Sequence, residues 1–144
     1  MDAAGKLINS WGDPKLLDPR LHSCAFDRQG NIWIASAPSG MVQKYSHDGK
    51  LLLQVGRKGV YDTSDGTEKG RPLNSNAAVF TDPSSLWIDP ANGDVWVSDG
   101  EGPRRNRRVV VLNAQGQFLR QWAPDATSIH CMGVARDGLF YLCD

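Results

Sequence analysis

Two short motifs alternate along this chain, and their alternation constrains the fold more than any other feature of the sequence. The first is a turn between two apolar runs, and its copies contain Gly30, Gly93 and Gly138. The second is a glycine followed six residues later by an apolar residue, and its copies begin at Gly5, Gly49 and Gly116. A unit this short buries its apolar face only against neighbouring units, so the pattern predicts a repeat architecture.

Each motif is expected to form part of a β-hairpin. Turn-forming residues and a glycine stand between runs rich in Ile, Val, Leu and Trp, as in hairpins. The runs last four to six residues, which is the length of a strand, and no segment keeps a 3.6-residue period. Two hairpins make four strands, which is one blade of a β-propeller, so the predicted fold class is all-β.

The spacing of the glycines sets the length of the repeat. Gly5 and Gly49 are 44 residues apart, and Gly93 and Gly138 are 45 residues apart. Both spacings fall within the roughly 40–50 residues that propeller repeats occupy. The same element therefore returns once per blade.

The repeat divides the chain into blades within a single domain. We expect half blades at residues 1–12 and 131–144 and full blades at about 22–56 and 84–122. Residues 57–80 are polar and rich in glycine, so they are expected to form a long surface loop between the blades.

The motif residues resemble NHL repeats, which build six-bladed propellers. The likeness rests on residues 27–34 (DRQGNIWI) and 89–100 (DPANGDVWVSDG), and it extends over nearly the whole chain outside the long loop. Residues 21–27 (LHSCAFD), 81–89 (TDPSSLWID) and 129–134 (IHCMGV) are similar to the peptidyl-α-hydroxyglycine α-amidating lyases and their bacterial relatives. The resemblance implies an NHL-type propeller of which this chain supplies three blades, half of six.

The same resemblance implies a metal site. In the lyases, a histidine at the start of the innermost strand of alternate blades points into the channel and binds zinc. His22 and His130 match two of those three histidines, so zinc is the implied metal, and the wider family also allows calcium. Asp82 matches an acidic residue of the intervening blade, Glu101 replaces the catalytic tyrosine, and Arg108 has a place in the family pattern. These three residues are predicted to bind a ligand.

Simpler explanations exist for the same residues. His22 and His130 could be polar residues at strand starts that bond to loops or water. Cys24 and Cys131 follow them at different spacings, so we expect both thiols to be buried as small hydrophobic groups rather than to bind metal. Three cysteines, an odd number without a repeated spacing, argue against a disulfide framework.

Charge and hydropathy limit the partners. The chain has 144 residues, with 16 basic and 16 acidic side chains, so no bulk attraction to nucleic acid or an acidic membrane is expected. The arginine-rich run has no aromatic stacking partners nearby, and Arg104, Arg105 and Arg107 are expected to lie in a solvated loop. No apolar run approaches the roughly 18 residues of a membrane span. A start without a signal-peptide pattern predicts the cytoplasm if the N-terminus is native.

Three blades are fewer than the four to eight of closed propellers. An open arc would expose the strands expected at residues 5–11 and 139–143. Because the two half blades are complementary, two copies could pair head to tail, which predicts a homodimer that closes six blades.

Two functions are compatible with these features. The first is an NHL-type propeller module that binds a small molecule or protein of unidentified kind. The alternative is a metal-dependent lyase related to the amidating enzymes. The metal content of the purified protein, and its loss in His22→Ala, would discriminate between them.

Overall fold

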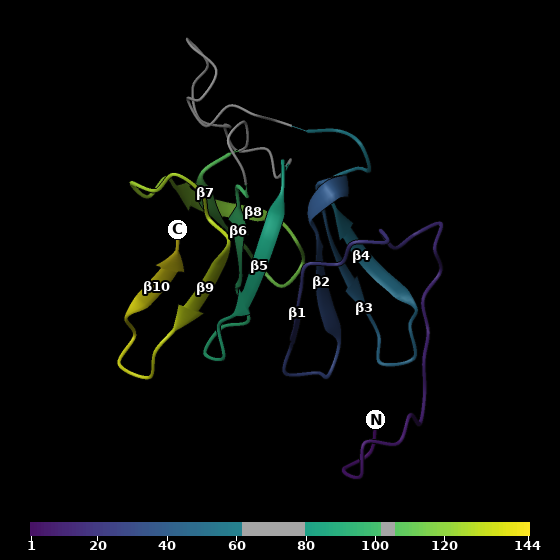
Figure 1. Cartoon of the computed structure of the whole chain (residues 1–144). Coiled ribbons are helices and arrows are strands. Elements are labelled where there is room, and N and C mark those ends of the chain that lie inside the picture. Colours follow the sequence, from purple (N-terminus) through teal and green to yellow (C-terminus); the bar gives the residue numbers. More distant parts are fainter. Residues whose placement is uncertain (62–79, 102–105) are drawn as a thin grey trace.

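The fold consists of short antiparallel β-sheets arranged side by side (Figure 1). The computed structural model describes residues 1–61, 80–101 and 106–144, and this part contains ten strands, no α-helix and one 3-10 turn, Ala37–Ser39. The predicted all-β class is confirmed. In the same described residues, no helix has the length and hydrophobicity that a bilayer span requires.

The first sheet has four strands in the order β1-β2-β3-β4. They are β1 (Ser23–Phe26), β2 (Ile32–Ser36), β3 (Met41–Tyr45) and β4 (Leu51–Val55). The turn between β1 and β2 is closed by the Asp27 carboxylate, which accepts hydrogen bonds from the backbone N–H groups of Gln29 and Asn31 at 3.0 and 2.9 Å. Gly30 takes φ +77° in this turn, a conformation that favours glycine.

The second sheet repeats this plan, and a third element repeats half of it. The second sheet consists of β5 (Pro83–Ile88), β6 (Val95–Asp99), β7 (Arg108–Leu112) and β8 (Phe118–Trp122), in that order. The third is a hairpin of β9 (Cys131–Val134) and β10 (Phe140–Cys143). The first strands of the three elements, β1, β5 and β9, lie next to one another. That arrangement brings residues at the starts of these strands together.

The strand expected at residues 5–11 is absent from the structure. The turn from Asp2 to Lys6 has the same backbone hydrogen bond as the turn from Ser46 to Lys50, at 3.0 and 2.9 Å. The segment after Asp2 therefore corresponds to a fourth strand, and none of the ten strands in the described residues pairs with it. A strand forms only when its N–H and C=O groups find a neighbour.

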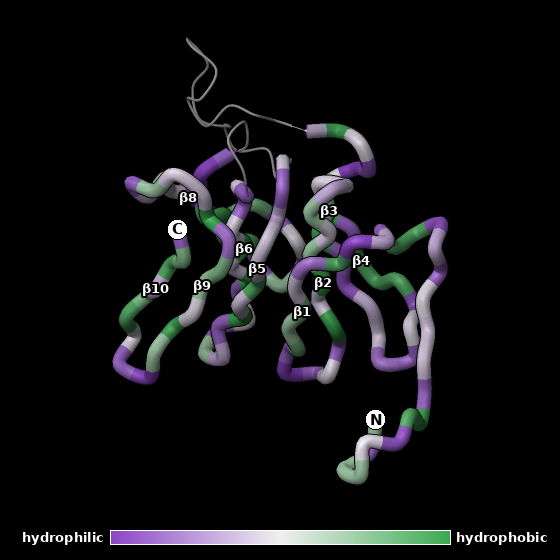
Figure 2. The backbone as a smooth tube through the Cα atoms, viewed as in Figure 1, coloured by the Kyte–Doolittle hydropathy of each residue, from purple (hydrophilic) through white to green (hydrophobic). Residues whose placement is uncertain are grey.

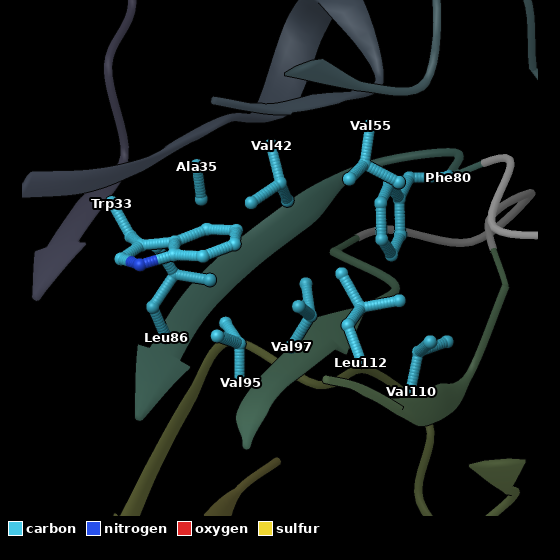
Figure 3. Packing of buried hydrophobic residues seen from close by; sticks show 10 residues of the cluster. All are labelled: Trp33, Ala35, Val42, Val55, Phe80, Leu86, Val95, Val97, Val110 and Leu112. Atoms are coloured by element: carbon cyan, nitrogen blue, oxygen red, sulfur yellow. The ribbon is translucent and has the colours of Figure 1, made fainter. Parts of the chain in front are cut away.

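The hydrophobic core lies between the two four-stranded sheets (Figure 3). Its members all project from the facing sides of these sheets or from the segment before β5: Trp33, Ala35, Val42, Val55, Phe80, Leu86, Val95, Val97, Val110 and Leu112. Trp33 is only 1% exposed. The hairpin turns are hydrophilic and the strands mostly hydrophobic (Figure 2), so the pattern of the sequence places its apolar residues between sheets.

A second interface joins the β9–β10 hairpin to the opposite face of the second sheet. Phe140 of β10 lies 5.2 Å from Trp96 and 5.8 Å from Trp122 between ring centroids. Aromatic pairs at such distances stabilise an interface beyond the area they bury. Sheet-to-sheet packing thus continues from the first element to the third.

Both expectations about cysteine burial are wrong. Cys131 and Cys143 are opposite each other in the β9–β10 register and form a disulfide. Cys24 is an exposed free thiol, because the face of β1 that carries it has no covering sheet. Of the loop expected at residues 57–80, residues 62–79 lie outside the described part of the chain.

Candidate functional site

Three side chains converge near the starts of the innermost strands. His22 directly precedes β1, His130 directly precedes β9, and Glu101 follows β6 after Gly100. The Nε2 atom of His22 lies 2.8 Å from Glu101 Oε2, and Nδ1 of His130 lies 3.2 Å from Glu101 Oε1. The ligand atoms of all three residues lie within 4.8 Å of one another. The structure thus brings together three residues that the sequence predicted separately.

Ser84 occupies the position in the second sheet that the histidines occupy in the other two elements. Its carbonyl oxygen accepts a hydrogen bond from His22 Nδ1 at 2.7 Å. Its hydroxyl donates to the carbonyl of Ile129 at 2.7 Å, next to His130. Ser84 therefore orients the His22 ring and holds the segment that precedes His130. This role was not predicted from the sequence, although Ser84 occupies the repeat position of the two histidines.

The hydrogen bond to Ser84 decides the chemistry of His22. Because Nδ1 donates its hydrogen to a carbonyl, Nε2 of the neutral ring carries a lone pair. This lone pair faces Glu101 Oε2, a buried oxygen that accepts no hydrogen bond from the described residues. Two such atoms 2.8 Å apart need a proton or a bound cation between them.

The donor set fits a divalent cation. Metal-binding histidines usually donate their other N–H to a carbonyl or a carboxylate, as His22 does. Two imidazoles and one carboxylate form a ligand set used for zinc and for several other first-row metals. Calcium prefers oxygen ligands, so the two imidazoles disfavour it.

Asp82 and Arg20 lie at the edge of this centre. The guanidinium of Arg20 is 4.0 Å from Asp82 Oδ1 and 3.9 Å from Glu101 Oε2. Asp82 is buried, whereas the Arg20 side chain is 60% exposed. Arg20 thus offsets part of the negative charge of two carboxylates. Arg20 was not predicted from the sequence because it stands outside the repeated motifs.

Arg108, the remaining residue predicted to bind a ligand, is buried and pairs with Asp99. Its side chain is fully buried, and its Nε and Nη2 each lie 2.9 Å from Asp99 Oδ2. The other Asp99 oxygen accepts the backbone N–H groups of Thr81 and Asp82 at 2.8 and 2.9 Å. A buried guanidinium needs a carboxylate partner. Arg108 therefore acts through Asp99, which fixes the segment that carries Asp82.

Gly100 links the segments that meet at the site. Its N–H donates to the carbonyl of Asp82 at 3.1 Å, and its carbonyl accepts the N–H of Ile129 at 3.0 Å. A Cβ at this position would lie 1.6 Å from the backbone oxygen of Asn106. Only glycine therefore permits the close approach that presents Glu101 to both histidines.

The segment before His130 is anchored separately. The His130 N–H donates to the carbonyl of Cys143 at 3.0 Å. Hydrogen bonds from the Thr127 hydroxyl and the Ser128 N–H hold the pKa of Asp144 below its ordinary value. These contacts attach the His130 segment to the end of β10.

Within the predicted basic run, Arg104 and Arg105 lie outside the described residues.

Adjacent four-stranded sheets, with polar residues gathered where their innermost strands begin, define a propeller-like repeat protein. The fold agrees with solved structures. Virginiamycin B lyase from Staphylococcus aureus superimposes with a TM-score of 0.57 and 14% identity, over 89% of this chain and 36% of that one. At this identity, the likeness concerns the fold alone.

Relatives in sequence point to the same kind of protein. No family model matches the chain. It is 28% identical over 109 residues to peptidylglycine alpha-amidating monooxygenase of Rattus norvegicus. The match covers 74% of this chain and 10% of that protein. It is 29% identical over 96 residues to NHL repeat-containing protein 3 of Homo sapiens, which covers 64% of this chain and 24% of that protein. These likenesses support the NHL-repeat, propeller-like family, as the motifs predicted.

Proposed function

We propose that this chain is an NHL-type propeller module that binds a divalent metal ion, and that the ion provides the binding site for a ligand. His22, Glu101 and His130 would be the metal ligands. The observation that carries the proposal is the 2.8 Å approach of His22 Nε2 to Glu101 Oε2 while His22 Nδ1 donates to a carbonyl. Zinc is the metal to which the family resemblance points, and it accepts this donor set.

Three protein ligands leave a coordination position open. When bound, the metal would polarise an oxygen atom of a ligand at that position. The chain's own residues would hold the centre in shape: Ser84 orients His22, and Glu101 supplies the negative charge. Arg20, at the exposed edge, would face a ligand that approaches from solvent.

The alternative function is a metal-dependent lyase related to the amidating enzymes. Its support is the sequence likeness to an amidating monooxygenase and the position of the two histidines. This chain spans about a tenth of that relative's length. Glu101 stands in place of the lyase tyrosine and offers a carboxylate instead of a phenol. Metal and ligand binding is therefore the function we favour.

Zinc titration of the chelator-treated full chain tests the proposal. We expect one zinc ion per chain. Loss of an outer-shell partner alone typically weakens metal binding about 10–100-fold, so His22→Ala, Glu101→Gln and His130→Ala should each weaken it by at least about 100-fold. His47, an exposed histidine in the turn between β3 and β4, provides the matched control His47→Ala. Absence of zinc binding, or equal affinity in all four variants, would disprove the site.

A further inference from the structure

Three aromatic residues occupy the same repeat position but differ in burial. Trp33, Trp96 and Tyr141 each stand three residues after the turn glycine in β2, β6 and β10. Trp33 is 1% exposed between the first and second sheets. Trp96 packs on Phe140 of the β9–β10 hairpin at 5.2 Å. Tyr141 is 58% exposed, so its side chain lacks the neighbouring sheet that covers its two equivalents.

The residues against which such an aromatic side chain packs also recur in the repeat. In the second sheet, Leu86, Val95 and Val97 share the core with Trp33 (Figure 3). The equivalent residues of the first sheet are Cys24, Ile32 and Ile34. The strand registers support this correspondence, because Cys24 pairs with Ile34 in the first sheet and Leu86 pairs with Val97 in the second.

These three equivalents face away from the core. Cys24, Ile32 and Ile34 line a mainly apolar pocket of about 360 Å³, together with Trp11, Leu17, Leu21, His22 and Ser23. The first sheet therefore has a receiving pocket, and no aromatic side chain from another sheet of the described residues fills it.

Trp11 packs on the outer side of the first sheet, at a position that Val55 occupies in the repeat. Val55 closes β4, and a Cβ on Gly116 of the next sheet would lie 2.8 Å from its Cγ2. Trp11 is the repeat equivalent of Val55, and a Cβ on Gly49 would lie 2.5 Å from its Cγ. Trp11 also packs on Tyr45 of β3 at 5.2 Å. Trp11 thus lies against the first sheet as Val55 lies against the second.

From these correspondences we propose that the pocket lined by Cys24, Ile32 and Ile34 receives Tyr141 from the β9–β10 hairpin of a second copy of this chain. The contact would continue the sheet-to-sheet packing already seen twice within the chain. Two copies make the contact reciprocally, and a two-fold axis closes the pair. The shared blade would contain the hairpin and residues 5–11, with its third strand position open.

Two single variants and their mixture test this arrangement. Tyr141→Asp removes the inserted side chain and leaves the pocket intact. Cys24→Trp fills the pocket from within and leaves Tyr141 intact, and Cys24 is exposed, so the fold should accept the change. Leu119→Asp, at an exposed apolar residue of β8, is the matched control. Light scattering at tens of micromolar should show dimers for the native chain and the control and monomers for each variant.

Mixing the two variants distinguishes a head-to-tail contact from other dimers. Each mixed pair keeps one intact contact, between Tyr141 of the pocket-filled chain and the open pocket of the other. We therefore expect a 1:1 complex in the mixture, weaker than the native dimer, from two samples that are monomeric alone. Recovery in the mixture also shows that both variants fold. A monomeric native chain, a dimer insensitive to both substitutions, or a mixture that stays monomeric would overturn the proposal.

Discussion

Asp99→Ala should destabilise the fold strongly, because Asp99 neutralises a guanidinium that has no access to water. Both side chains of the Asp99–Arg108 pair are 0% exposed. The alanine variant removes the Asp99 carboxylate from the buried Arg108, whereas the hydrogen bond from Arg108 to Gln121 at 2.7 Å remains. It also removes the acceptor of the Thr81 and Asp82 N–H groups.

Breaking a buried ion pair by removing one partner costs about 3–5 kcal/mol. A domain of ordinary stability has about 5–15 kcal/mol in total, so the variant should lose a large fraction of it. With a urea dependence of about 1–3 kcal/mol per molar, the unfolding midpoint should fall by roughly 2 M. Fluorescence of the five tryptophans reports the transition.

The matched comparison is the double variant Asp99→Leu with Arg108→Met. Replacing a buried pair with apolar side chains of similar volume leaves no uncompensated charge, so the double variant should be more stable than Asp99→Ala. If Asp99→Ala lowered the free energy of unfolding by less than about 1 kcal/mol, the reasoning would be refuted, because removing one partner of a buried ion pair costs more than this. Equal instability of the single and double variants would refute it as well.

Three further outcomes are expected. Gly100→Ala should prevent folding in thermal melts, because its Cβ would lie 1.6 Å from a backbone oxygen, whereas Gly133→Ala meets no atom within 4 Å at an ordinary φ and should be mild. Burial raises the pKa of Asp27, but hydrogen bonds, chiefly from Lys44, outweigh it and hold the pKa below 3.8. The stability from this carboxylate is therefore present above pH 3.8 and lost as pH falls through the lower folded pKa; Asp27→Asn should flatten that acid limb in urea titrations. Trp33→Ala should cost about 3–5 kcal/mol in the same assay.

The sequence by itself determined the hairpins and their order. A turn with glycine at the φ > 0 position is a local requirement, and the alternation of apolar residues is local as well. The turns and the strands can therefore be predicted from the sequence without knowing which segments contact one another in the fold. Equivalent positions in repeats have equivalent places in space, so His22 and His130 could be placed at equivalent strand starts of alternate elements. Their expected role, like the roles of Asp82 and Glu101, came from the resemblance to the lyases.

Only the tertiary structure decided which side chains complete the site. Ser84 is separated from His22 by 62 residues along the chain, and Arg20 stands in a segment without a repeat. Arg108 was predicted at the ligand but is buried against Asp99. The strand expected at residues 5–11 did not form, because a strand requires a neighbouring strand for its backbone hydrogen bonds, and its own residues do not specify that neighbour. Propensity and turn chemistry act over a few residues, whereas a charge or an unpaired N–H is satisfied by whatever group the completed fold places beside it.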